Sequence, residues 1–232
     1  MVNEQRIIIA EMFGPTFQGE GPTAGTYSSF VRLGRCNLDC SWCDTPYTWD
    51  WTRHDPTKEL TEVPVSAVID HLRQKPPTNL IITGGEPLVQ RAACIALVDQ
   101  WDGTIEIETN GTIQPPRELL DSPRVRFNVS PKLLSSGVAY EKAIKPEVLH
   151  RYIDHARSHF KFVIQHHADL TALDDLIRTL HLPRQRTWIM PEGRNMQDII
   201  DGLCWLAPYA LERRINLSNR LHVQLWDDKR GV

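Results

Sequence analysis

The 232-residue sequence predicts an α/β protein in which helical crossovers connect the strands of a mostly parallel sheet. Short apolar runs alternate along the chain with longer segments whose apolar residues recur at helical spacing, as in successive βαβ units. The unusual motifs follow the predicted strands, at the end where parallel α/β proteins gather their chemistry. The length suits one domain with a sizeable core, so we expect residues 1–232 to form a single domain.

The first half of the chain predicts strands and helices in alternation. Each strand is a short apolar run, and the later strands end in glycine, proline or asparagine, which are common turn residues. The strands are expected at 7–12, 27–33, 79–82 and 104–109, and the helices within 60–74, after Pro64, and at 89–101. The second strand leads directly into a loop with three cysteines.

The second half continues this order. A strand at 125–129 ends in Ser130-Pro131-Lys132, and the next helix begins with Pro146, which fits the first helical turn. The remaining strands are expected at 160–165, 187–190 and 221–226, and the helices at 146–157, 170–180 and 195–207. The segment 133–185 predicts helix and strand but suggests no functional role.

Composition and charge exclude several classes of protein. The formal net charge is -3, whereas a nucleic-acid-binding surface is usually basic, and no apolar run approaches the length of a membrane span. The N-terminus shows no signal peptide, and five cysteines do not make a disulfide framework for this length, so a reducing cytoplasm is expected. Cys94 and Cys204 each lie in an apolar predicted helix, which indicates core packing.

The other three cysteines, Cys36, Cys40 and Cys43, lie within eight residues of one another. Three thiolates on one loop can hold a metal centre, but they leave it one ligand short of a closed structural site. A zinc knuckle completed by His54 or His71 is one interpretation, although zinc sites usually contain a second ligand pair. Cysteine thiolates are also the usual ligands of a 4Fe–4S cluster, and three of them leave one iron open.

The CxxxCxxC spacing with Trp42 before the last cysteine resembles the signature of the radical S-adenosylmethionine (SAM) superfamily. Gly84-Gly85-Glu86-Pro87 resembles the motif of these enzymes that contacts the SAM amino group. The resemblance implies a partial (β/α) barrel and a 4Fe–4S cluster whose open iron is chelated by SAM. One electron then cleaves the sulfonium to methionine and a 5′-deoxyadenosyl radical, a case in which cofactors carry the chemistry.

An ordered series of further motifs resembles the 7-carboxy-7-deazaguanine synthases within that superfamily. The series consists of Gln18-Gly19-Glu20-Gly21, Phe30-Val31-Arg32, Cys43-Asp44-Thr45, Thr83 to Pro87, Glu108-Thr109-Asn110-Gly111 and Ser130-Pro131-Lys132. The resemblance implies conversion of 6-carboxy-5,6,7,8-tetrahydropterin into 7-carboxy-7-deazaguanine, with loss of ammonia, in 7-deazapurine biosynthesis. It also implies a homodimer and an external one-electron donor such as a flavodoxin or ferredoxin.

The same resemblance assigns expected roles to individual residues. Thr45 is expected to bind Mg²⁺, and the N-terminal segment and C-terminal tail are expected to close the active site. The substrate is expected to contact Phe17, Gln18, Gly19, Glu20, Arg32, Thr83, Trp226 and the terminal carboxylate of Val232. SAM is expected to contact Gly85, Glu86, Glu108, Asn110, Ser130, Pro131, Lys132, Met190, Pro191, Glu192 and Gly193.

Two other functions compete with this hypothesis. A glycyl-radical activating enzyme is also a radical SAM protein of similar size, but it acts on a protein backbone and lacks the Gln18 to Gly21 motif. A zinc-stabilised binding module would not be an enzyme at all. Partners are expected to be small molecules and the electron donor, without nucleic acid or membrane.

Overall fold

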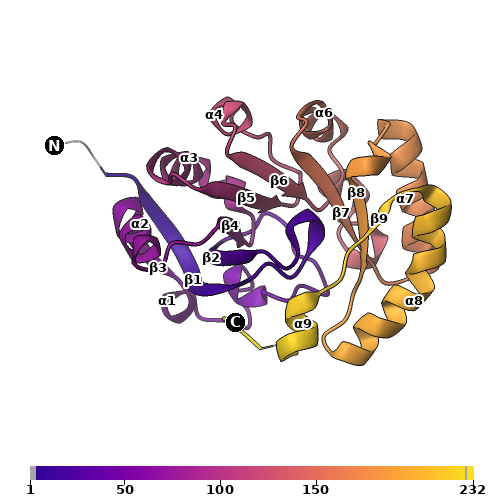
Figure 1. The fold of residues 1–232 in the computed structure, drawn as a ribbon, viewed down its shortest axis with the longest axis horizontal. Helices are drawn as coiled ribbons and strands as arrows, with labels where there is room; N and C mark the ends of the chain where they lie inside the picture. Colours follow the sequence, from indigo (N-terminus) through magenta and orange to yellow (C-terminus); the bar gives the residue numbers. More distant parts are fainter. Residues whose placement is uncertain (1–3, 228) are drawn as a thin grey trace.

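The computed structural model describes residues 4–227 and 229–232. Within them, nine strands form one sheet in the order β3-β1-β2-β4-β5-β6-β7-β8-β9. Neighbouring strands run parallel from β2 to β9, whereas β1 pairs antiparallel with both β2 and β3. The sheet ends at β3 and β9, which do not pair with each other, so it curves into a partial barrel that stays open (Figure 1). The expected fold class is therefore confirmed.

The strands and helices have the following bounds. The strands are β1 Arg6–Phe17, β2 Tyr27–Leu33, β3 Thr61–Pro64, β4 Asn79–Gly84, β5 Thr104–Thr109, β6 Val125–Val129, β7 Ser158–Ile164, β8 Thr187–Pro191 and β9 Asn216–Leu217. The helices are α1 Pro56–Glu59, α2 Val65–Gln74, α3 Arg91–Gln100, α4 Arg117–Asp121, α5 Tyr140–Ala143, α6 Pro146–Asp154, α7 His167–Leu180, α8 Met196–Arg213 and α9 Leu221–Trp226.

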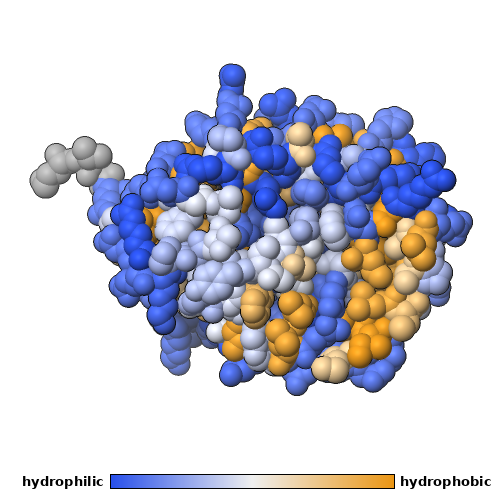
Figure 2. All heavy atoms as spheres, in the orientation of Figure 1, coloured by the Kyte–Doolittle hydropathy of each residue, from blue (hydrophilic) through white to orange (hydrophobic). Residues whose placement is uncertain are grey.

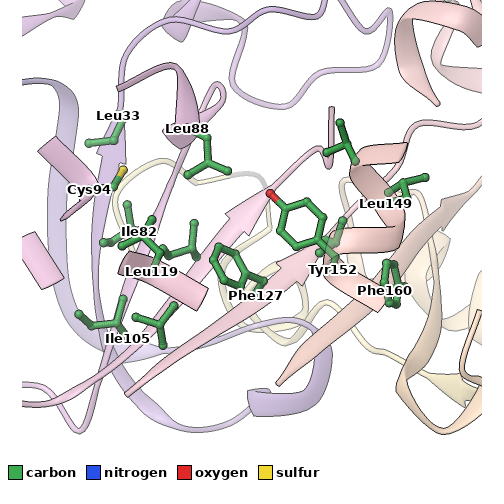
Figure 3. Packing of buried hydrophobic residues seen from close by; sticks show 14 of the residues in the cluster. Leu33, Ile82, Leu88, Cys94, Ile105, Leu119, Phe127, Leu149, Tyr152 and Phe160 are labelled. Carbon is green, nitrogen blue, oxygen red and sulfur yellow. The ribbon is translucent and has the colours of Figure 1, made fainter. Parts of the chain in front are cut away.

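Helices α2, α3, α4, α6, α7 and α8 lie along the outer side of the curved sheet (Figure 1). The core forms between them and the sheet because alternate residues of each strand point to that side. Figure 3 shows Phe127 of β6 and Phe160 of β7 packed near Tyr152 of α6, and all three side chains are fully buried. On these strands, the residues that alternate with the buried aromatic residues point to the inner side of the sheet, where the polar groups of the site lie.

The prediction of a strand at 221–226 is wrong, because these residues form helix α9. Leu221, Val223 and Leu225 alternate with polar residues, which is the pattern of a half-buried strand. In the structure, the last strand is the two-residue β9, and the backbone N–H of Leu221 donates to the carbonyl of Gly19. This contact turns the segment away from the sheet, so tertiary structure overrides the local pattern.

The helix expected after Pro64 begins at Val65 and ends at Gln74, as predicted, and Thr61–Pro64 pair with β1 as an edge strand. One smaller prediction needs correction. Cys204, expected in the core, is exposed on α8, whereas Cys94 is fully buried as expected.

Hydrophobic side chains gather on one part of the surface, over α8 and α9, while the rim above them is mainly hydrophilic (Figure 2). Leu211 of α8 and Leu225 of α9 are among the exposed residues there, with exposed fractions of 79% and 50%. Over the described ranges, no helix combines the length and apolar character needed to cross a membrane.

Candidate active site

A cavity of about 270 Å³ opens on the inner side of the sheet, at the carboxyl ends of its parallel strands. Most of the residues that the sequence singled out line it, although they come from segments throughout the chain. They are Phe17, Gln18, Gly19, Glu20, Arg32, Cys36, Cys40, Cys43, Thr45, Thr83, Gly85, Glu108, Asn110, Ser130, Lys132, Met190, Glu192 and Val232. The cavity therefore joins the cysteine loop, the N-terminal motif and the end of the chain in one site.

Five expected residues lie outside the lining: Glu86, Pro131, Pro191, Gly193 and Trp226. Gly193 acts through its carbonyl, which accepts a hydrogen bond from Arg220 at 2.7 Å. Trp226 lies at the end of α9, one turn beyond His222, and it is His222 that reaches the cavity. The expected contact between Trp226 and the substrate stays a prediction.

Glu86 is fully buried and binds the protein itself. Its carboxylate accepts hydrogen bonds from the backbone N–H of Asn110 at 2.7 Å, the hydroxyl of Thr109 at 2.9 Å and the backbone N–H of Leu88 at 3.0 Å. Burial raises the pKa of Glu86 above its ordinary value. The side chain therefore fixes the loop after β4 to the end of β5, and the expected contact between Glu86 and SAM stays a prediction.

Gly85 explains why the loop after β4 is rich in glycine. A Cβ atom at this position would lie 2.1 Å from the carbonyl oxygen of Arg35 and 2.9 Å from Cβ of Cys36. A side chain would therefore separate this loop from the base of the cysteine loop. Gly84 has φ +138° and is equally close to the backbone of Leu33, a conformation that favours glycine.

Several contacts hold the cysteine loop in place. Asn110 donates to Asn37 at 2.9 Å, and the backbone N–H of Ser41 donates to the carbonyl of Ser136 at 2.9 Å. The indole N–H of Trp49 donates to Sγ of Cys43 at 3.3 Å. The amide of Asn110, expected to face SAM, is thus occupied by the cysteine loop and Thr112, although the residue still lines the cavity.

The three cysteines are half-buried and line the cavity together. Burial raises the pKa of Cys36 to about 12, and burial also raises the pKa of Cys40. Ligand sulfurs must be thiolates, so these groups lose their protons when metal binds. The backbone N–H of Leu38 at 3.4 Å from Sγ of Cys36, together with the indole of Trp49, supplies hydrogen bonds to sulfur of the kind that tune iron–sulfur clusters.

The zinc-knuckle hypothesis is not supported by the positions of the histidines. His54 lies 3.8 Å from Glu59 and beside Tyr47, and His71 is exposed on α2. In the part of the chain that the structure describes, no group of three or more histidine, cysteine, aspartate or glutamate side chains is arranged to hold a metal ion. Neither His54 nor His71 lines the cavity that the three cysteines line.

Glu20 lies between two buried cations. Its carboxylate accepts from Nζ of Lys161 on one side and from Nε of Arg220, at 2.9 Å, on the other. Arg220 also donates to Asp44 at 2.9 Å. Burial alone would raise the pKa of Glu20, but the charges of Lys161 and Arg220 hold it well below its ordinary value. Glu20 is therefore an ionised carboxylate at neutral pH.

Sequence analysis assigned no functional role to Lys161, Arg220 or His222. All three line the cavity, and His222 lies 3.8 Å from Glu20 and above Gly19, where a Cβ atom would lie 1.9 Å from its ring. Burial lowers the pKa of His222, which favours the neutral ring. For these three residues the sequence contains one signal of a functional role. Lys161 stands between Phe160 and Phe162 in a predicted buried strand, where a charged side chain needs a partner. The partner is 141 residues away and could not be deduced.

A second ion-pair network anchors the C-terminal tail. Arg230 donates to Glu11 of β1 and, at 3.0 Å, to Glu59, and its guanidinium lies 3.7 Å from the ring centre of Tyr47. Glu11 also accepts from Arg32 at 2.9 Å. Val232 lines the same cavity as Arg32, so the anchor at Arg230 holds the end of the chain beside the site.

Polar side chains cover the floor of the cavity. Gln18 donates to Glu106 at 2.9 Å and to Glu108 at 3.2 Å, and Thr83 donates to Glu108 at 2.7 Å. Burial raises the pKa of Glu106, and the charge of Glu108 adds to this effect. Near the cysteine loop, Lys132 donates to Ser130 at 3.1 Å and lies 5.4 Å from the ring centre of Trp42.

The chain is similar to known proteins in both sequence and fold. A model of the radical SAM superfamily matches residues 31–171. A 7-carboxy-7-deazaguanine synthase from Hyperthermus butylicus is 34% identical over 225 residues, covering 93% of this chain and 91% of the relative. The synthase of the same name from Bacillus subtilis is 29% identical, covering 97% and 98%. The crystal structure of QueE from Escherichia coli superposes with a TM-score of 0.72 and 26% identity, covering 94% and 95%.

Replacing Glu20 by glutamine leaves Lys161 and Arg220 buried without the negative charge between them. We expect this variant to be about 3–5 kcal/mol less stable than wild type at neutral pH. The pKa of Glu20 is lowered from 4.5, so its ionised form stabilises the fold above that pH and loses this effect as the pH falls further. Measured by urea unfolding, the difference in free energy of unfolding between wild type and Glu20→Gln should therefore become smaller below about pH 4.5.

Asp175→Asn is the matched control, because Asp175 forms only an exposed ion pair with Arg178 on α7. Its free energy of unfolding should stay within about 0.5 kcal/mol of the wild-type value at every pH of the series. A difference between wild type and Glu20→Gln that persists unchanged under acid conditions would contradict the assigned ionisation of Glu20.

Proposed function

This chain belongs to the 7-carboxy-7-deazaguanine synthases of the radical SAM superfamily, and we propose that it converts 6-carboxy-5,6,7,8-tetrahydropterin into 7-carboxy-7-deazaguanine. It is a radical SAM lyase of 7-deazapurine biosynthesis, and the reaction releases ammonia. The observation that carries the proposal is the shared cavity. Three cysteines, the Gln18 to Gly21 motif, Arg32 and the end of the chain meet there.

The cysteine loop fits a 4Fe–4S cluster with one open iron. Cys36, Cys40 and Cys43 would hold it, and Leu38 and Trp49 would donate hydrogen bonds to the ligand sulfurs. When bound, the cluster and SAM supply the abstraction of a hydrogen atom from C6 of the substrate. The residues of the chain would hold SAM and the pterin next to each other and keep water out of the site, as catalysis by proximity requires.

We place SAM on the side of the cavity next to the cysteine loop. Gly85, Asn110, Ser130, Lys132, Met190 and Glu192 line this side and would contact SAM. Lys132 is a cation beside Ser130 and Trp42, and it suits the SAM carboxylate. Gly85 brings backbone close to both the ligand and the cysteine loop.

We place the pterin between the N-terminal motif, Arg32 and the tail. The guanidinium of Arg32 is held by Glu11 through one nitrogen, so its planar fork can receive the substrate carboxylate. Phe17 to Glu20, Thr83 and Glu108 would hold the ring. Glu20 is ionised and can accept from ring N–H groups, and the carboxylate of Val232 would accept from the guanidine-like edge.

Mg²⁺ would bind at Thr45, whose hydroxyl lines the cavity 3.7 Å from Sγ of Cys43. A hard cation with one hydroxyl ligand, the substrate carboxylate and several waters is ordinary magnesium coordination. The ion would orient the substrate and stabilise negative charge during rearrangement. Thr45 itself is buried, which fixes the position of its hydroxyl.

The enzyme class requires an external one-electron donor, and we propose a flavodoxin or ferredoxin. We also propose a cytoplasmic homodimer in which each chain is one domain. Contacts between the two ends of the chain support the single domain: Leu221 donates to Gly19, Arg220 pairs with Glu20, and Arg230 pairs with Glu11. The same contacts support our proposal that the N-terminal segment and the tail close the active site. The mass of the reconstituted protein in solution tests the dimer.

The proposed activity is tested by anaerobic reconstitution with iron and sulfide, followed by incubation with SAM, a reductant and 6-carboxytetrahydropterin. We expect 7-carboxy-7-deazaguanine and ammonia in equal amounts. Alanine at Cys36, Cys40 or Cys43 should abolish both products and SAM cleavage, whereas alanine at the exposed Cys204 should leave them unchanged. SAM cleavage without deazaguanine would favour a glycyl-radical activating enzyme, and stoichiometric zinc without a cluster would favour a binding module.

Deleting Gly231 and Val232 removes the terminal carboxylate from the cavity. We expect the Kd for 6-carboxytetrahydropterin to rise about tenfold or more, because paired charge-assisted hydrogen bonds are lost. The Kd for SAM should stay the same, since Lys132 and Gly85 are untouched. Val232→Ala keeps the carboxylate and serves as the control. Equal pterin affinity in the deletion variant would remove the assigned role of the tail.

Thr45→Val keeps the shape of the side chain but removes its hydroxyl. We expect the magnesium concentration for half-maximal turnover to rise about tenfold, the size of effect typical when a metal site loses a supporting group. Thr45→Ser keeps a hydroxyl and should resemble wild type. A magnesium response that is the same in Thr45→Val and wild type would show that Thr45 only shapes the turn before Pro46.

A further inference from the structure

Asn128 of β6 has a side chain that the fold leaves without a partner. The residue is 1% exposed and lines the cavity. Within the described residues, neither its Nδ2 nor its Oδ1 has a hydrogen-bond partner. Most buried polar atoms are paired, and an unpaired one costs roughly 1–3 kcal/mol, so an amide with both ends free needs an explanation.

The surroundings of Asn128 are arranged around this amide. Gly21, the last residue of the N-terminal motif, has φ +68°, and a Cβ atom there would lie 2.7 Å from Nδ2 of Asn128. Any other residue at this position would press on the amide. The N–H of Gly21 is bound to Ser218 at 2.7 Å, so the turn that leaves this space is itself fixed.

The position along β6 shows which reactant Asn128 faces. Asn128 is in register with Glu108 of β5, whose carboxylate binds Gln18 and Thr83 on the pterin side. Ser130, the first residue after β6, binds Lys132 beside the cysteine loop, on the side where we place SAM. Asn128 therefore belongs to the half of the cavity in which we place the pterin.

The chemistry of a primary amide narrows the ligand further. Oδ1 accepts and the adjacent NH₂ group donates in one plane, so the side chain pairs with a donor next to an acceptor. Tetrahydropterin has two such edges, one with N5–H beside the C4 carbonyl and one with N8–H beside N1. In the fully oxidised ring, N5 and N8 carry no hydrogen, and Oδ1 would face a lone pair.

We propose that Asn128 selects the reduced pterin ring by accepting a hydrogen bond from its ring N–H and donating to the neighbouring acceptor. This inference rests on the proposed function and adds a determinant of specificity to it. A site built to pair with a substrate N–H rejects an analogue without that hydrogen, because its own polar group then stays buried and unpaired. Asn128 would thus make the enzyme distinguish 6-carboxytetrahydropterin from 6-carboxypterin.

Asn128→Leu tests this proposal, since leucine has a similar size and no polar atom. Binding is measured by anaerobic calorimetry with reconstituted protein and no reductant, so that the substrate does not react. We expect the Kd for 6-carboxytetrahydropterin to rise about ten- to a hundredfold and the preference over 6-carboxypterin to shrink by a similar factor. The Kd for SAM should be unchanged.

Thermal unfolding of the ligand-free variant separates this role from a structural one. Because the amide has no protein partner, leucine should leave Tm unchanged or raise it. Asn79→Leu is the matched control, since Asn79 is a buried asparagine on β4 outside the cavity lining, and its pterin affinity should equal that of wild type. Asn128→Ala, which adds no bulk, repeats the test if leucine prevents folding.

Three results would overturn the proposal: unchanged pterin affinity in Asn128→Leu, loss of SAM affinity instead, or a Tm lowered by several degrees. If wild type forms no deazaguanine from 6-carboxytetrahydropterin, the proposed function fails and this inference fails with it. If wild type turns over normally while Asn128→Leu keeps its affinity and preference, only the role of Asn128 is refuted.

Discussion

The carboxylate of Glu20 is the negative charge on which the walls of the active site depend. It binds Lys161 of β7 and Arg220 before α9, two cations that lie 141 and 200 residues further along the chain. Each cation is about 6% exposed, so neither can be hydrated by bulk water. Removing Glu20 would leave Lys161 with only a 3.9 Å contact to Glu108 and Arg220 with only Asp44, and weakening the compensation of buried charges is strongly destabilising. The N-terminal motif, the sheet and the C-terminal helix are therefore held together at the cavity.

The same constraint explains why the inner side of the sheet carries so many polar groups. Strands β5, β6 and β7 place isoleucine, valine and phenylalanine toward the helices, and Glu106, Glu108, Asn128 and Lys161 at the alternate positions. A sheet with helices on only one side would usually turn a polar face to water. Here Gln18 and Glu20 of the N-terminal motif bind Glu106 and Lys161 of that face, and Arg220 binds Glu20, so these polar groups bind one another. Asn128 is the member of this layer whose amide the protein leaves unbound.

The sequence predicted the elements best where local pattern and tertiary structure agree. Strands β2, β5 and β6 have the predicted bounds, and in β5 and β6 apolar residues alternate with polar ones, which is the pattern of a strand. The segment after Arg220 was mispredicted, because it has the same alternation but forms a helix whose first residue, Leu221, donates to Gly19. Motifs identified the cysteine loop and the N-terminal turn. Lys161, Arg220 and His222 carry no motif, and their partners are distant in sequence, so only the folded chain reveals them.

The cysteine loop is positioned by the protein and not by the metal it would hold. Asn37, Ser41 and Trp49 fix it through hydrogen bonds, and Gly85 lets the loop after β4 lie against its base. In a zinc knuckle the metal supplies most of the folding energy, and the loop has no structure without it. Here a core of buried strands and helices exists independently of the thiols. Loss of the cluster should therefore remove reactivity and leave the fold, which is the arrangement that lets an open iron serve chemistry instead of structure.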